Sequence, residues 1–146
     1  MNRRLVDTLL IIAIVADLGL AIAAVASPST WFATMHDGVT VDTLHHALLD
    51  RAAGAWAMLA IVQLAALIGW RRWSGWLLIV AGARLSDVLP DVFYLAGSPA
   101  RTISTWGLLG APIINLAFAW FLITAWRTSS SAQFTISGHG ASSHSM

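Results

Sequence analysis

Hydrophobic residues fill four long stretches of the chain, and polar residues gather between them. The four stretches run over residues 5–26, 52–70, 74–95 and 105–126. Each reaches about the 20 mostly apolar residues that a helix needs to cross a bilayer. They are connected by a loop over residues 27–51, a tight turn at Arg71 and Arg72, and a short "GSPAR" link. The pattern predicts an all-α protein whose residues 1–127 form an integral membrane four-helix antiparallel bundle.

The first stretch also has features of a cleaved signal peptide, because "NRR" precedes it and "AVAS" closes it. Its length of about 22 residues exceeds the usual 7–15-residue apolar core of such peptides. Asp17 also interrupts the apolar run. We therefore expect this stretch to stay as a membrane helix.

The composition indicates that lipid is the solvent of this chain. Hydrophobic residues make up 58% of the sequence and charged residues only 10%, against about 25% charged in an ordinary soluble domain. The chain has no Lys, Glu or Cys, which excludes disulfides, thiolate metal sites and CxxC redox pairs. The arginines are scattered along the chain and its formal charge is +1, so we expect no nucleic-acid partner.

The arginines also predict how the bundle is oriented. In a four-pass arrangement most of them lie on one side of the membrane: Arg3, Arg4, Arg71, Arg72 and Arg127. Only Arg51 and Arg101 lie on the other side. The positive-inside rule then places both termini in the cytoplasm. The tail over residues 128–146 is rich in Ser and Gly and is predicted to be disordered.

Charged residues occur inside the third stretch, in the segment "ARLSDVLPD" over residues 83–91. Arg84, Asp87 and Asp91 are spaced by three and four residues, so they share one helix face. At a rise of about 1.5 Å per residue, Arg84 lies roughly 15 Å and Asp87 roughly 20 Å from the cytoplasmic end. Asp17 and Asn115 lie at nearly the same depth, roughly 18 and 16 Å. The spacing predicts a polar centre near the bilayer midplane.

A charged side chain at this depth costs about 2.5–3.5 kcal/mol on insertion scales, so we expect these residues to face inward and pair. Arg84 should contact Asp17, Asp87 or both, because a guanidinium binds two carboxylates well. Three interpretations stay open. The centre fixes helix register, or it binds a small molecule or lipid headgroup, or it conducts protons or ions.

Several residues around this centre could serve either packing or ligand binding. Trp56 either packs against neighbouring helices or caps a cavity. Pro90 and Pro112 either free carbonyls that line a cavity or only kink their helices. Gln63 is expected to bond across helices. Arg51 and Asp91 lie at a similar height and are candidates to pair.

The outer loop contains several titratable residues without a recognisable metal motif. Asp42 precedes a helical pattern and is a candidate N-cap. His46 and Asp50 are four residues apart, as two ligands of a metal site can be. No HExxH pattern or third ligand at a fixed spacing accompanies them, so we predict a solvated loop and no metal site.

The segments "DRAAGAW" and "RLSD", within this spacing of helices, resemble the small BphX-like membrane proteins, which belong to the wider group of DoxX-like four-helix proteins. The resemblance covers about residues 1–126 and implies a four-helix inner-membrane protein. It also implies a link to quinone-coupled oxidation or to degradation of aromatic compounds, as for some relatives. No set of catalytic residues carries over.

The leading hypothesis is a non-catalytic accessory module that binds a hydrophobic or aromatic small molecule at the midplane centre, without a cofactor. Its candidate ligand-binding residues are Asp17, Trp56, Arg84, Asp87, Asp91 and Asn115. One alternative is a quinone-linked oxidoreductase subunit, in which an acid such as Asp87 relays protons. Another is a purely structural or interaction protein. A homo-oligomer or a partner membrane subunit is compatible with each of them.

Overall fold

The computed structural model describes residues 3–35, 42–97 and 105–139, and every regular element within them is an α-helix. The helices are α1 (Arg3–Ala26), α2 (Pro28–Met35), α3 (Thr43–Gly69), α4 (Gly75–Gly97) and α5 (Thr105–His139). Three segments are long and apolar enough to cross a membrane, namely α1, α3 and Leu109–Ser130 of α5. α4 is of similar length but carries the three charged residues of "ARLSDVLPD". The all-helical prediction is confirmed, together with helices suited to a membrane.

α3 begins earlier than the hydrophobic pattern predicts, at Thr43 instead of residue 52. The Asp42 carboxylate accepts a hydrogen bond from the backbone N–H of His45 at 2.8 Å, which caps the first turn. This confirms Asp42 as the predicted N-cap. Hydrophobicity alone misses the start because His45, His46, Asp50 and Arg51 interrupt the apolar run.

α5 continues beyond the fourth hydrophobic stretch into the predicted tail, and residues 128–139 are part of the helix. Hydroxyl side chains within a helix can satisfy their hydrogen bonds on the carbonyls of the preceding turn. Thr128 and Ser129 do this, and each hydroxyl donates to the Ala125 carbonyl at 2.9 Å. Residues 140–146, the rest of the predicted tail, lie outside the described part of the chain.

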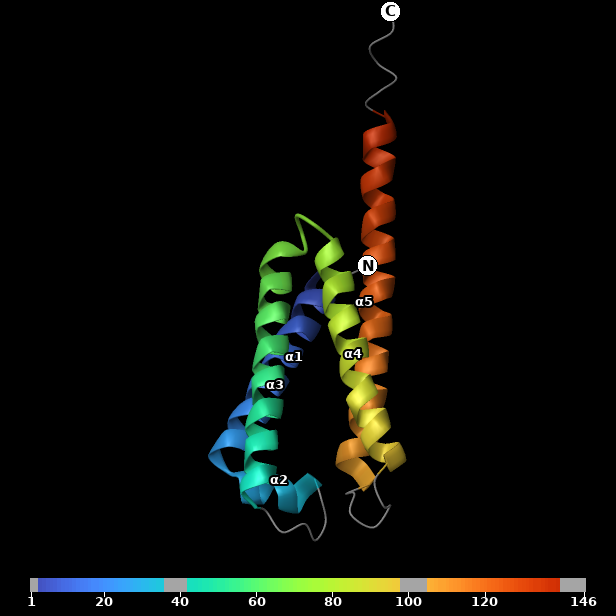
Figure 1. The fold of residues 1–146 in the computed structure, drawn as a ribbon. Coiled ribbons are helices and arrows are strands. Elements are labelled where there is room, and N and C mark those ends of the chain that lie inside the picture. Colours follow the sequence, from blue (N-terminus) through green and yellow to red (C-terminus); the bar gives the residue numbers. More distant parts are fainter. Residues whose placement is uncertain (1–2, 36–41, 98–104, 140–146) are drawn as a thin grey trace, which may run out of the picture.

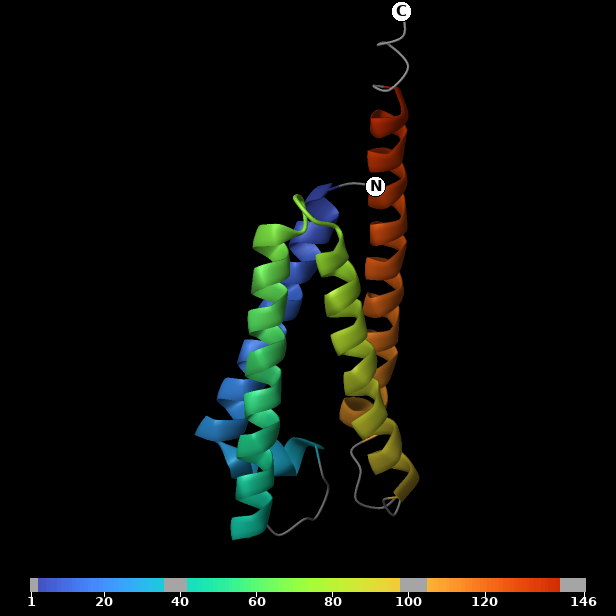
Figure 2. The ribbon, with the colours of Figure 1, turned by 45° about the horizontal axis from the view of Figure 1, so that its top comes forward.

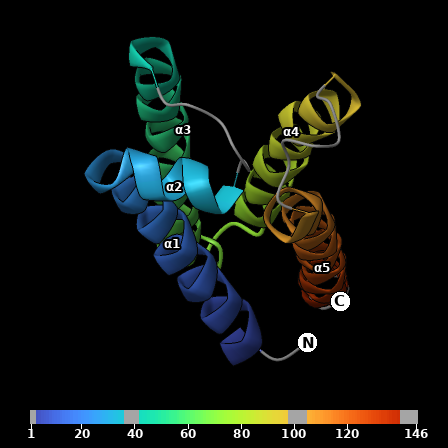
Figure 3. The ribbon, with the colours of Figure 1, turned by 90° about the horizontal axis from the view of Figure 1, so that it is seen from below.

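The long helices pack as two pairs, α1 with α3 and α4 with α5. The pairs come together at the turn between α3 and α4 and diverge toward the other end, as Figures 1 and 2 show. Figure 3 shows α2 lying across the divergent end, directed from α1 toward α4 and α5. We call the end with the α3–α4 turn the turn end, and the opposite end the α2 end.

Two apolar clusters follow from this arrangement. The cluster at the turn end takes residues from all four long helices: Val6, Leu10, Ala66, Trp70, Leu77, Val80, Ala81, Ala119, Leu122 and Ala125. The cluster at the α2 end takes residues from α1, α2 and α3: Ala21, Ala24, Phe32, Leu49 and Ala53. Alanine is frequent in both because small side chains let helices approach closely. Among the described residues, the two helix pairs therefore share an apolar core near the turn end.

Polar bonds reinforce the turn end. Asp7 of α1 accepts a hydrogen bond from Trp70 Nε1 at 2.9 Å and pairs with Arg71. The hydroxyls of Ser74 and Ser130 lie 3.3 Å apart, which places α5 beside the turn. At Gly75 an added Cβ would lie 2.5 Å from the Trp73 indole, so a larger residue there would have to displace that ring. α1, the turn and α5 are thereby held together.

Candidate functional site

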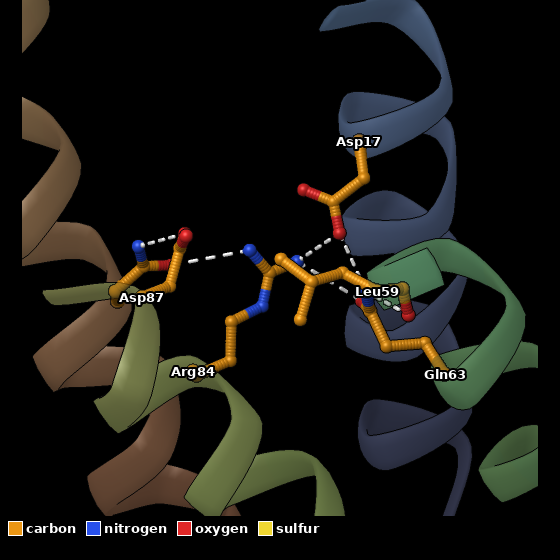
Figure 4. Close-up of polar contacts among 6 residues, drawn as sticks. Asp17, Leu59, Gln63, Arg84 and Asp87 are labelled. Carbon is orange, nitrogen blue, oxygen red and sulfur yellow. Dashed lines mark hydrogen bonds and ion pairs between the residues drawn. The ribbon is translucent and has the colours of Figure 1, made fainter. Parts of the chain in front are cut away.

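A polar centre lies between the two apolar clusters, and each long helix contributes a side chain to it. The four residues are Asp17 of α1, Gln63 of α3, Arg84 of α4 and Asn115 of α5, and all four are at least 93% buried. Figure 4 shows Arg84 reaching from α4 toward Asp17 and Gln63 on the opposite helices. The predicted convergence of Asp17, Arg84 and Asn115 is confirmed.

The Arg84 guanidinium is the hub of this centre. Its Nη2 donates to Asp17 Oδ2 at 2.5 Å and to Gln63 Oε1 at 3.1 Å. Its Nη1 donates to Asn115 Oδ1 at 3.1 Å. The guanidinium carbon also lies 5.5 Å from the centre of the Phe118 ring, within the range of a cation–π interaction. Arg84 thus joins the α4–α5 pair to the α1–α3 pair.

The two amides fix the orientation of the charged groups. Gln63 Nε2 donates to Asp17 Oδ2 at 2.5 Å and to the Leu59 carbonyl at 2.8 Å. Asn115 Nδ2 donates to Asp87 Oδ2 at 3.0 Å. Each amide therefore accepts from Arg84 and donates to an acid. Gln63 bonds across helices as predicted, and it belongs to the centre although it is not among the candidate ligand-binding residues.

Arg84 contacts only one of the two acids that the sequence offers it. It forms a buried ion pair with Asp17, while Asp87 is linked to it indirectly through Asn115. Breaking a buried pair by removing one partner costs about 3–5 kcal/mol, because the other charge stays buried. The Arg84–Asp17 pair therefore fixes the position of α4 relative to α1.

One polar atom of the centre has no partner. Arg84 Nε is buried and makes no hydrogen bond within the described residues. An unsatisfied buried donor typically costs about 1–3 kcal/mol, and more when the group is charged. The centre therefore keeps one hydrogen-bond donor that no described residue accepts.

Asp91 was predicted to share a helix face with Arg84 and Asp87, but it lies apart from the polar centre. It is half-buried, and its carboxylate forms no hydrogen bond or ion pair within the described part of the chain. The candidate pair with Arg51 does not form, and Arg51 is exposed on α3. Arg51 lies about 18 Å along α3 from Gln63, whereas Asp91 lies only about 10 Å along α4 from Arg84. The divergence of α3 from α4 separates them further.

Trp56 also lies away from the polar centre, in the apolar cluster at the α2 end. Its ring is 4.9 Å from that of Trp31, with the two planes tilted by 48°. Seven residues, or about 10 Å of helix, separate Trp56 from Gln63. The structure therefore favours packing as its role, in line with the first of the two interpretations.

The histidines of the outer loop do not gather into a metal site. Among the described residues, no group of three His, Cys, Asp or Glu side chains could hold a metal ion. His45 instead contacts Asp42 at 2.7 Å and packs edge-on against Phe32. The hydrogen bond from the His45 backbone N–H holds the pKa of Asp42 below its usual value, and the His45 ring adds to this effect. His36 lies outside the described residues.

Comparisons with known proteins add no relative, since the chain matches no protein-family model, no curated protein and no solved structure. The resemblance to BphX-like and DoxX-like proteins therefore stays a prediction based on "DRAAGAW" and "RLSD". Function has to be argued from the polar centre itself.

Proposed function

We propose that the chain is a four-pass protein of the bacterial inner membrane, an antiparallel bundle with both termini in the cytoplasm. Three apolar helices support this topology directly. α4 can complete it because its buried charge, Arg84, is neutralised and hydrogen-bonded inside the protein. The excess of arginine at the turn end supports its cytoplasmic orientation.

We propose further that this protein is a non-catalytic membrane module that binds an apolar small molecule at the Arg84 centre. The observation that carries the proposal is the unused Arg84 Nε donor in an otherwise bonded network. A polar oxygen on a largely apolar ligand would satisfy it. Because Nε is covered by protein atoms, neighbouring side chains must move aside for such a ligand to reach it.

The charges of the centre limit the kind of ligand. Asp17 already neutralises Arg84, and Asp87 lies nearby through Asn115. A carboxylate or phosphate would meet these two acids, whereas a neutral carbonyl oxygen would accept from Nε without repulsion. Quinones and aromatic ketones belong to this class, and a retained quinone would favour the role of a subunit in quinone-linked oxidation.

A second candidate function is purely structural, and one observation favours it. Apart from Nε, the guanidinium and both amides of the centre direct their hydrogen bonds to each other, to the acids and to the Leu59 carbonyl. Such a closed network can specify helix register without any ligand. The two functions differ in whether a molecule stays bound.

The test is an organic extract of the full chain purified in mild detergent, analysed by mass spectrometry and absorption. The matched variant is Asp17→Leu/Arg84→Met, which removes both charges and so leaves no buried charge unpaired. Arg51→Met, an exposed arginine at the other end, is the control. The proposal expects one molecule in the parent and the control but not in the double variant. Extracts that are identical in all three would favour the structural role.

A further inference from the structure

The turn end carries a ring of arginines that the Arg84 centre does not use. We call these five residues the basic rim: Arg3, Arg4, Arg71, Arg72 and Arg127. They come from the start of α1, the α3–α4 turn and α5. Three segments that are distant in sequence therefore supply one charged surface.

Contacts between these segments show that the rim is a single surface. Arg71 pairs with Asp7 on α1, and Trp70 donates to the same carboxylate. Ser74 at the end of the turn lies 3.3 Å from Ser130, one turn of α5 beyond Arg127. Figures 1 and 2 show the start of α1, the turn and this part of α5 at the same end of the molecule.

The rim has a strong excess of positive charge. Asp7 is the one described acid near it, because the other described aspartates lie in the polar centre or toward the α2 end: Asp17, Asp42, Asp50, Asp87 and Asp91. Asp7 is occupied by Arg71. Arg72 and Arg3 are exposed, and neither side chain forms an ion pair within the described residues. The rim therefore presents guanidinium groups to its surroundings.

The same end is also strongly apolar at its sides. Ile68 is 75% exposed and Trp73 is 57% exposed, and the Trp73 ring packs edge-on against Trp76 at 5.9 Å. Indole rings of this kind are typical of the interface between headgroups and acyl chains. A partner of the rim must therefore combine negative charge with an adjoining apolar body.

We propose that the basic rim binds the headgroups of anionic phospholipids. A phospholipid places its phosphate at the level of the arginines and its acyl chains against Ile68 and Trp73. Arginine suits this role because its planar guanidinium binds phosphate through two parallel hydrogen bonds. The proposal does not depend on a ligand at Arg84, which lies deeper in the bundle.

The experiment uses the full chain in mixed micelles that contain equal amounts of phosphatidylglycerol and phosphatidylcholine. Native mass spectrometry measures the ratio of the two lipids bound to the protein. The parent should bind more phosphatidylglycerol, and Arg72→Gln should lower the ratio by about fivefold, the usual effect of one arginine near an anionic surface. Arg3→Gln/Arg72→Gln should lower it further, and added salt should weaken the preference in the parent.

The control is Arg51→Gln, because Arg51 is an exposed arginine at the α2 end. It should leave the ratio unchanged. Equal binding of both lipids by the parent would overturn the proposal. An equal fall of the lipid ratio in Arg51→Gln and Arg72→Gln would overturn it as well. Displacement of the bound phosphatidylglycerol by excess inorganic phosphate would also overturn it, because a free anion would then be the better ligand.

Discussion

Arg84 of α4 and Asp17 of α1 form a buried ion pair, with Nη2 and Oδ2 at 2.5 Å. The residues are 67 positions apart in sequence and belong to different helix pairs. Their contact lies between the two apolar clusters, and Figure 4 shows Arg84 reaching from α4 to Asp17 on α1. The relative position of the pairs should therefore depend strongly on this one interaction.

Removing one partner of this pair should destabilise the protein far more than removing both. We expect Arg84→Met to cost about 3–5 kcal/mol of unfolding free energy, because Asp17 is left buried and unpaired. Asp17→Leu/Arg84→Met should recover most of that loss. Unfolding in mixed micelles with increasing SDS measures the unfolding free energy of the single variants Asp17→Leu and Arg84→Met and of the double variant. A loss of unfolding free energy in the double variant that equals the sum of the two single losses would show that the two charges are not coupled.

The amide of Gln63 should contribute measurably to stability. Gln63→Leu removes one donor to Asp17 and one acceptor for Arg84. Measured hydrogen bonds between membrane helices average about 0.6 kcal/mol and reach about 1.7, and we expect a loss within that range. Ile61→Leu, at an exposed position of the same helix, is the control for the same SDS titration. Equal stability of Gln63→Leu and the parent would contradict the network.

Asp91 should be dispensable for folding. Its carboxylate has no partner within the described residues and is only half-buried. Asp91→Leu should leave the unfolding free energy unchanged within about 0.5 kcal/mol, or raise it, since it removes a charge from a membrane helix. Thermal unfolding in detergent measures this. A loss above about 1 kcal/mol would indicate a partner that the structure does not show.

The start of α3 should depend on pH through Asp42. Its pKa lies below the usual 3.8, chiefly because the ionised carboxylate accepts the His45 backbone N–H. A group with a lowered pKa stabilises the folded state above its unfolded pKa, and this stabilisation is lost as the pH falls through the folded value. Hydrogen exchange in the first turn of α3 should therefore quicken, relative to its intrinsic rate, only at acidic pH below 3.8. Asp42→Asn keeps a capping side chain that does not titrate, so it should abolish this pH dependence of the exchange rate. The same pH dependence in Asp42→Asn and in the parent would contradict this account.

The polar centre was predictable from sequence because helix geometry is regular. A fixed rise per residue is enough to place Asp17, Arg84 and Asn115 at one depth. Their burial then follows from the cost of exposing charge to lipid. Gln63 carried the same signal, a polar amide within an apolar helix, and belongs to the same network.

The positions of Trp56 and Asp91 were not predictable in the same way. Hydrophobic runs give the length of a membrane helix, but its tilt and rotation are set by packing against neighbours. Here α3 and α4 diverge, so residues at similar heights, such as Asp91 and Arg51, do not meet. Helix ends were missed because the Asp42 cap starts α3 ahead of its apolar run, and because α5 continues into a segment whose Thr and Ser hydroxyls bond to helix carbonyls; neither feature adds hydrophobicity.

The central claim is that a bound molecule uses the free donor of Arg84, and nitrogen NMR of the arginine side chains tests it most directly. The full chain is labelled at arginine Nε and compared before and after its organic-soluble fraction is removed and added back. The account predicts that the Arg84 Nε–H signal shifts to a hydrogen-bonded position when the fraction is present, while the exposed Arg51 signal stays in place. An Arg84 signal that is the same in both preparations would contradict it.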